Sequence, residues 1–297
     1  MISHLPLTLT KSLSDSVTLK TDNNDCEFLI IEHPKFNAAF TLHGAHLIHF
    51  QLTEQAPIIW LSNKAVFNNK SPIRGGVPIC WPWFGAADKT LGENLPSHGF
   101  ARISKWSLSQ LSESQQSIEL EFKLVSNEET MKLWPYHFEL TLKATLSDTL
   151  KLELITENKG QVPFNYRGAL HSYFNISAPE NVKVTGLNKE YYNSLKNKQL
   201  EVGDTTLLFD QAIDAIYKKA KTQINLDDIK LNRTLTISDE GNNSEVLWTP
   251  WEAGSKAFTD LPDDAYKTML CIESAITGSE GQQVNVGEKH SLSTHIK

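Results

Sequence analysis

Short runs in which apolar and polar residues alternate recur along the whole chain. Residues 117–124 read SIELEFKL, with isoleucine, leucine and phenylalanine alternating with glutamate and lysine, and residues 137–146, HFELTLKATL, repeat the pattern. A period of two is typical of a strand that buries one face. Helical periodicity is weak, and only residues 255–264 indicate a short helical turn. The remaining predicted strands are residues 17–20, 26–32, 38–52, 150–157, 182–186, 233–238, 245–250 and 269–274.

Turn-forming residues separate the predicted strands. Clusters rich in Asn, Asp and Gly lie at residues 22–25, 158–160 and 239–243, where they favour tight turns. Residues 107–117 are rich in serine, but they lie between strand-like segments, so we interpret them as a hairpin connection rather than a linker. No repeat with a period of about 20 to 50 residues is present, which disfavours propellers and solenoids. We therefore expect an all-β protein in which residues 1–297 form one domain, a large antiparallel β-sandwich.

The composition is that of a folded, water-soluble protein. The 297 residues include 28 Lys and Arg against 35 Asp and Glu, a net charge of −7, and 40% are hydrophobic. This apolar content excludes disorder over most of the length. The acidic balance argues against a nucleic-acid partner, because binding to phosphates relies on a basic excess. No apolar run approaches the roughly 20 residues that span a membrane, and no secretory signal is recognisable. We expect a cytoplasmic protein with no membrane partner.

Residues that bind metals do not form a convincing cluster. The three cysteines are far apart and odd in number, which predicts neither a disulfide framework nor a zinc site. His43, His46 and His49 would gather on one side of a helix, whereas a strand would turn His46 away from the other two. The apolar residues around them favour the strand. We therefore predict no metal site.

The longest irregular segment is residues 71–102, which are rich in Gly, Pro and Trp. Long irregular loops in compact domains are usually functional. Gly75 and Gly76 would let the backbone approach a ligand closely beside Arg74, and an arginine fork suits phosphate oxygens. Arg102 lies in the same segment, and surface ion pairing is the alternative role for both arginines. Four tryptophans either stack on sugar rings or, as is more usual, fill the core: Trp81, Trp83, Trp248 and Trp251.

Two further residues are candidates for acid–base chemistry. His171 lies among aromatic residues just after a predicted strand, where a histidine is more often a satisfied core residue than a catalyst. Glu273 follows an apolar run within a strand that otherwise indicates burial. A buried carboxylate is costly unless it is paired or functional. The two groups would form a general acid–base pair if they lay on neighbouring strands, which the sequence alone does not establish.

Six short motifs stand out along the chain: IRGGVP at residues 73–78, WPWFG at 81–85, HGFAR at 98–102, ALHSYF at 169–174, WTPW at 248–251 and CIE at 271–273. Together they resemble the glucose-6-phosphate 1-epimerases, or hexose-6-phosphate mutarotases, of the aldose 1-epimerase superfamily. They occur in the order found in that family and spread over about 200 residues. Any one of them is weak evidence, whereas the ordered set is specific.

The resemblance implies a galactose mutarotase-like β-supersandwich that interconverts the α and β anomers of a hexose 6-phosphate. It implies that Glu273 takes the proton from the C1 hydroxyl and that His171 protonates the ring oxygen. Reclosure of the ring after rotation about C1–C2 gives the other anomer. The resemblance also implies a sugar phosphate as the only partner and no cofactor. A single large sandwich needs no second copy to bury its core, so we expect a monomer. The implied substrate-binding residues are Arg74, His98, Arg102 and Asp214.

The chain departs from the family pattern at three positions. Ser97 replaces a glutamine, Ala215 replaces an arginine and Thr249 replaces an asparagine. Ser97 is too short for the contact to substrate expected of glutamine, and Ala215 removes a cation next to Asp214. Two other functions remain open at this point: a mutarotase for unphosphorylated aldoses, and a sandwich that binds sugar phosphates without catalysis.

Overall fold

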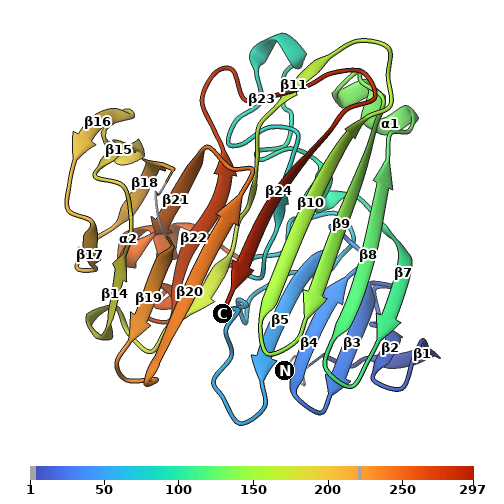
Figure 1. The fold of residues 1–297 in the computed structure, drawn as a ribbon, viewed down its shortest axis with the longest axis horizontal. Helices are drawn as coiled ribbons and strands as arrows, with labels where there is room; N and C mark the ends of the chain where they lie inside the picture. The colour runs from blue at the N-terminus through green and yellow to red at the C-terminus, as the bar shows by residue number, and fades with distance from the viewer. Residues whose placement is uncertain (1–4, 220–222) are drawn as a thin grey trace.

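The structure, a computed structural model, describes residues 5–219 and 223–297. The strands in these ranges form four antiparallel sheets (Figure 1). The first sheet follows the chain order, and a turn at residues 43–45 divides the single strand that the sequence predicted over residues 38–52. That prediction is therefore wrong, because Gly44 and Ala45 adopt positive φ and reverse the chain. The five strands of this sheet are β1 (Thr8–Ser12), β2 (Val17–Thr21), β3 (Glu27–His33), β4 (Phe36–Thr41) and β5 (His46–Leu52).

A nine-stranded sheet forms the broad layer of the sandwich. The serine-rich residues 107–117 contain one of its strands, so their interpretation as a connection is wrong. A bulge between Leu108 and Gln110 explains the error, because it lets Leu108 and Leu111 both pack on the core although they are three residues apart. In sheet order the strands are β17 (Thr206–Leu208), β14 (Val182–Thr185), β19 (Ile224–Asp228), β20 (Arg233–Glu240), β24 (Lys289–Ile296), β10 (Leu150–Asn158), β9 (Phe138–Leu146), β8 (Ile118–Val125) and β7 (Ser107–Glu113).

An eight-stranded sheet carries most of the candidate site, and one of its eight strands, β13 (Tyr173–Asn175), pairs with β22 outside the main order. The fourth sheet is the small pair β11 (Phe164–Tyr166) and β23 (Gln282–Val284). The other seven strands of the eight-stranded sheet follow the order β16 (Gln199–Val202), β15 (Glu190–Asn193), β18 (Ile213–Lys218), β21 (Ser244–Thr249), β22 (Met269–Ile276), β12 (Gly168–Leu170) and β6 (Ile79–Cys80).

Helices are short and few in the described part of the chain. The turn predicted at residues 255–264 overlaps α2 (Trp251–Ala257), which begins four residues earlier, and α1 (Glu128–Leu133) is capped by Asn127. None of the described helices is long and apolar enough to cross a membrane. The 3₁₀ turns are η1 (Lys89–Leu91), η2 (Ala101–Ile103), η3 (Pro179–Asn181), η4 (Ser194–Lys196) and η5 (Ala265–Lys267).

The two faces of the eight-stranded sheet have different roles. Leu247 and Ile272 belong to the main apolar core, together with the inward residues of the nine-stranded and five-stranded sheets. Their neighbours Trp248 and Cys271 belong to a separate cluster on the opposite face. Figure 1 shows the nine-stranded sheet running across the front, with the other large sheets behind it. The predicted antiparallel β-sandwich is confirmed, and the second face of the eight-stranded sheet is left outside its core.

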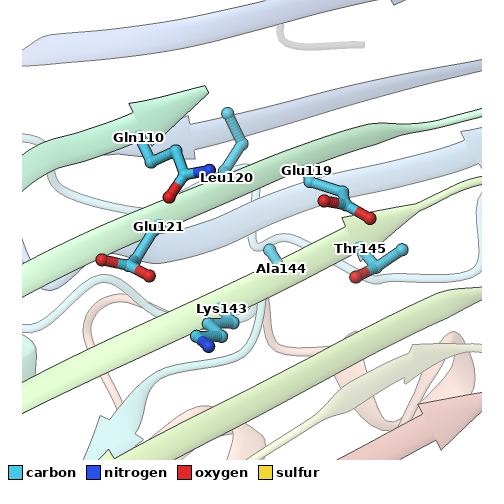
Figure 2. Close-up of a pocket in the computed structure, with 7 residues that line it drawn as sticks. All are labelled: Gln110, Glu119, Leu120, Glu121, Lys143, Ala144 and Thr145. Atoms are coloured by element: carbon cyan, nitrogen blue, oxygen red, sulfur yellow. The ribbon is translucent and has the colours of Figure 1, made fainter. Parts of the chain in front are cut away.

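The outer face of the nine-stranded sheet is not where the candidate residues gather. A recess of about 240 Å³ lies over β7, β8 and β9 (Figure 2). Glu121 and Lys143 are direct cross-strand partners in it, and Glu119 faces Thr145. Opposite charges paired across exposed strands are typical of a solvated sheet surface.

Candidate active site

His171 and Glu273 lie in contact on the face of the eight-stranded sheet that points away from the core. Glu273 is on β22, on the same side as Cys271, and His171 lies between β12 and β13 with its backbone N–H donating to the Pro78 carbonyl. The His171 Nε2 and Glu273 Oε1 atoms are 3.2 Å apart. Glu273 is 1% exposed and His171 9% exposed. The fold thus brings together the two residues that the sequence could not show to be neighbours.

Burial moves the pKa of each member of the pair toward its uncharged form. The pKa of Glu273 is raised well above its usual value, mainly by desolvation and further by the charge of Asp214, against the opposing effect of Arg102. Desolvation lowers the pKa of His171 well below 6.5, and the nearby His98 and arginines lower it further. Glu273 Oε2 and His171 Nδ1 have no hydrogen-bond partner within the described residues. Each group therefore keeps a free polar atom.

Aromatic side chains enclose the His171 imidazole. The Tyr173 ring stacks on it with centroids 4.9 Å apart and an interplanar angle of 12°, and Trp248 meets it edge-on at 6.3 Å. Trp248 is partly exposed, whereas Trp81 and Trp83 are buried in the core. Of the four tryptophans, Trp248 lies beside the candidate pair. The sequence reasoning included Tyr173 in a motif but assigned it no role.

Arg74 is held by three side chains. Its Nε donates to Asp260 Oδ1 at 3.2 Å, its Nη1 donates to the Tyr173 hydroxyl at 3.3 Å, and its Cζ lies 4.6 Å from the centroid of the Phe258 ring. Arg74 is therefore neither a free surface cation nor remote from His171. Asp260 and Phe258 were missed by the sequence reasoning, since they lie in a loop some 186 residues away along the chain.

Gly75 and Gly76 let their backbone pack closely against neighbouring segments of the protein. Both have positive φ, and a Cβ on Gly76 would meet the His46 Nε2 at 2.5 Å and the Leu47 carbonyl. The His46 Nε2 donates to the Gly75 carbonyl at 2.8 Å. Gly76 thus packs the Arg74 segment onto β5 and Gly75 packs it against Trp60 and Leu61, while the expected close approach to a ligand stays a prediction.

His98 and Arg102 also lie near the pair, and the charge of Arg102 acts on both of its members. The His98 ring is 6.0 Å from the His171 ring, and its Nδ1 accepts the backbone N–H of Gly85 at 3.2 Å. Desolvation, with the charges of Arg102 and Arg74, lowers the pKa of His98 to about 4. His98 is therefore neutral near pH 7, with its proton on Nε2 as a donor.

The backbone of Ser97 takes part in the site. Arg102 Nη2 donates to the Ser97 carbonyl at 2.9 Å, and Arg102 Nε is buried without a partner in the described ranges. The Ser97 hydroxyl is directed to the Gly85 carbonyl at 3.3 Å. The carbonyl that accepts this hydrogen bond from Arg102 belongs to the backbone, so it is present whether residue 97 is serine or glutamine.

Asp214 reaches the same face from β18. It is the cross-strand partner of Trp248, so its side chain lies on the side of Cys271 and Glu273. Burial raises its pKa, while a hydrogen bond from Ser194 and the charge of Lys198 act in the opposite direction. It borders a pocket of about 230 Å³ that also includes Asn193, Lys196 and Glu201.

The other two departures from the family pattern face away from the site. Ala215 packs in the main core, so an arginine at this position would not point to the face of Asp214. The interpretation that Ala215 removes a cation from the site is therefore wrong. Thr249 is buried and lies on the opposite side of β21 from Trp248.

His46 and His49 lie in β5, and His43 lies just before it. A register break between Ala39 and Phe40 makes a bulge in β5, so His46 and His49 share one face, contrary to the prediction for a regular strand. His43 Nε2 donates to the Ser71 carbonyl at 3.0 Å. Over residues 5–219 and 223–297, no group of three or more His, Cys, Asp or Glu side chains has an arrangement suited to a metal ion.

Comparison with known proteins identifies the family. The sequence model described as aldose 1-epimerase matches residues 27–297. The chain belongs to the aldose 1-epimerase family. A Salmonella typhimurium relative is 37% identical over 252 residues, which cover 84% of this chain and 83% of the relative. An Escherichia coli relative is 34% identical over 275 residues, covering 92% and 91%. Both carry the name “Putative glucose-6-phosphate 1-epimerase”.

Solved structures extend the likeness over nearly the whole chain. A Salmonella typhimurium crystal structure described as a “putative mutarotase” has a TM-score of 0.92 at 33% identity and covers 99% of this chain and 97% of its own. The structure of HI1317 has a TM-score of 0.83 at 32% identity and covers 99% of both chains. The expected galactose mutarotase-like fold is confirmed. As a member of the aldose 1-epimerase family, the protein is an isomerase.

Proposed function

We propose that this aldose 1-epimerase family member interconverts the α and β anomers of a hexose 6-phosphate. The observation that carries the proposal is the buried His171 and Glu273 pair, 3.2 Å apart on the free face of the eight-stranded sheet. The names of the two curated relatives point to glucose 6-phosphate as the substrate. A binding protein without catalysis would gain nothing from a buried carboxyl whose neighbour is an imidazole.

The pair holds a single proton near neutral pH in this mechanism. Both pKa shifts favour a neutral carboxylic acid beside a neutral imidazole. Transfer of that proton from Glu273 to His171 gives a carboxylate and an imidazolium without changing the total charge. Because two such groups titrate together, the proton belongs to the pair rather than to either residue.

Ring opening then uses the two groups in opposite directions. The Glu273 carboxylate takes the O1 proton as the C1=O1 double bond forms, the C1–O5 bond breaks, and His171 gives its proton to O5. The pair returns to a neutral acid and a neutral imidazole, and the open-chain aldehyde rotates about C1–C2. The reverse proton transfers close the ring to the other anomer. Each positioned proton transfer typically contributes about 10²- to 10⁴-fold.

The remaining candidate residues bind the sugar phosphate in this proposal. Arg74 and Arg102 supply positive charge for the phosphate, since an arginine retains free N–H donors after one or two are used. His98 offers a neutral Nε2 donor to the sugar, and Asp214 accepts from a hydroxyl. The proposal also includes a monomer in the cytoplasm whose residues 1–297 act as a single domain.

A specific contact favours a second candidate, a mutarotase for unphosphorylated aldoses. Arg74 is already paired with Asp260, and this acidic partner reduces the positive charge available to a phosphate. In that case the arginines would hold the loop rather than the substrate. The two candidates share the catalytic pair and differ in what the arginines do.

Substitution of the arginines distinguishes the candidates. A charged hydrogen bond is worth roughly 1.5–3 kcal/mol, so Arg74→Ala or Arg102→Ala should lower kcat/KM for glucose 6-phosphate by about 10- to 150-fold. Activity on free glucose should hardly change, because it has no dianion to lose. Anomer exchange measured by NMR on both sugars checks this. Equal losses on both sugars would favour the unphosphorylated-aldose mutarotase.

A further inference from the structure

Tyr173 contacts both halves of the proposed site. Its ring lies flat against the His171 imidazole, and its hydroxyl accepts the hydrogen bond from Arg74 Nη1 at 3.3 Å. Burial raises the pKa of Tyr173 far above its usual value, so the hydroxyl is neutral and keeps this role across the physiological range. One side chain therefore joins the candidate acid to the candidate anion-binding arginine.

The surroundings leave the Tyr173 ring little freedom. Trp60 stacks on it with centroids 6.0 Å apart and Trp248 meets it edge-on at 6.1 Å. Its backbone N–H donates to the Gly76 carbonyl at 2.9 Å, two residues after Arg74 in the sequence. Both the ring and the backbone of Tyr173 thus fix the Arg74 segment relative to the imidazole.

We propose that Tyr173 is a positioning residue that holds Arg74 for the anion through its hydroxyl and holds the His171 imidazole against Glu273 through its ring. The inference rests on the proposed function for the identity of the anion, a sugar phosphate. It separates two contributions of one side chain. The hydroxyl affects the binding of phosphorylated ligands, and the ring affects turnover of any sugar.

Two substitutions separate these contributions. Tyr173→Phe keeps the ring and removes the hydroxyl, so the KM for glucose 6-phosphate should rise about 5- to 30-fold with kcat and activity on free glucose unchanged. The expected effect is smaller than that of losing a direct contact to the phosphate, because Arg74 itself remains in the variant. Tyr173→Leu also removes the stacked ring. It should lower kcat on both sugars by about 10-fold or more, because misplacement of a catalytic group is costly.

Tyr166→Phe is the matched control. Tyr166 is equally buried and its hydroxyl is 2.8 Å from His290 Nδ1, on a strand outside the site. Its substitution removes a buried tyrosine hydroxyl without touching Arg74 or His171. We expect unchanged kcat and KM in this variant, so an effect of Tyr173→Phe on KM alone cannot be attributed to a general loss of stability.

Binding of inorganic phosphate, measured by ³¹P NMR, tests the Arg74 contact without relying on turnover. The Kd for phosphate should rise about 5- to 30-fold in Tyr173→Phe and stay unchanged in Tyr166→Phe. Equal Kd values in Tyr173→Phe and the wild type would overturn the inference. If the wild type binds phosphate and Tyr173→Phe weakens it, but only free sugars are anomerised, the substrate proposal fails and the positioning role stands. A wild type that binds no phosphate overturns both.

Discussion

Glu273 is a weaker acid in the folded protein than in the unfolded chain. An apolar strand and the Asp214 charge raise its pKa, and desolvation is the larger cause. Its Oε2 has no partner among the described residues. A buried, partly unsatisfied carboxyl destabilises a fold, and such groups are retained where they have a function. Activity at this site should therefore be gained at the expense of stability.

Glu273→Gln should stabilise the protein while removing its activity. A group whose pKa is raised by folding contributes its stability below its unfolded pKa and loses it as the pH rises through the folded pKa. The glutamine cannot ionise, so the variant's advantage should grow as the pH rises above the ordinary glutamate range. Urea denaturation at pH 5, 7 and 8 measures the difference. A variant whose stability relative to wild type is the same at every pH would contradict the assigned pKa shift.

Single residues differed in how far the sequence could reveal them. Glu273 stood out as a candidate because a carboxyl inside an apolar strand has a known cost, and the motifs made His171 the second candidate. The partners of Arg74 were not predictable from local patterns, since Asp260 and Tyr173 are distant in the chain and meet it only in the folded protein. Position 215 was misinterpreted because adjacent strand residues point to opposite faces.

At the scale of elements, regular strands were predicted well and irregular ones were not. β8 and β9 lie within one residue of their predicted bounds because their alternation is uninterrupted. Bulges in β5 and β7 break the period of two, which misled the prediction for His46 and for residues 107–117. The loop of residues 71–102 has no period at all, and its shape depends on contacts such as that of Gly99 with Trp81.

Two glycines of this loop allow a matched test of its packing. Gly99 and Gly85 both have positive φ, but a Cβ on Gly99 would overlap the Trp81 carbonyl, whereas a Cβ on Gly85 would meet nothing within 4 Å. Gly85→Ala should cost only the roughly 1–2 kcal/mol of a left-handed backbone. Gly99→Ala should cost more and reduce activity, because it displaces His98 and Arg102. Urea denaturation and kinetics check this, and equal losses in both variants would contradict the assigned packing.

At the scale of the whole molecule, the sandwich gathers residues that are remote in sequence and buries several ionisable groups with them. The all-β class and the antiparallel arrangement followed from strand periodicity, whereas the division into four sheets depended on long-range pairing that periodicity does not encode. The burial of histidines was likewise not predictable. Desolvation lowers the pKa of His46 to about 3 and that of His49 to about 4.

These buried histidines should make the fold sensitive to acid. Their folded pKa values lie below the unfolded value of about 6.5, so their contribution to stability is present above pH 6.5 and is lost as the pH falls toward 4 and 3. The free energy of unfolding should therefore decrease steadily below pH 6.5, with a shallower decrease in His49→Gln. Denaturation series at constant ionic strength measure both slopes. Identical slopes in the variant and the wild type would show that His49 does not contribute.

The central claim is that Glu273, paired with His171, catalyses anomer exchange of a hexose 6-phosphate. The most direct measurement is NMR exchange between the α and β anomeric protons of glucose 6-phosphate, corrected for spontaneous exchange, with wild type and Glu273→Gln at equal concentration. We predict rapid exchange with wild type and only the spontaneous rate with a folded Glu273→Gln variant. Near wild-type exchange in the variant, or no acceleration by the wild type, would contradict the account.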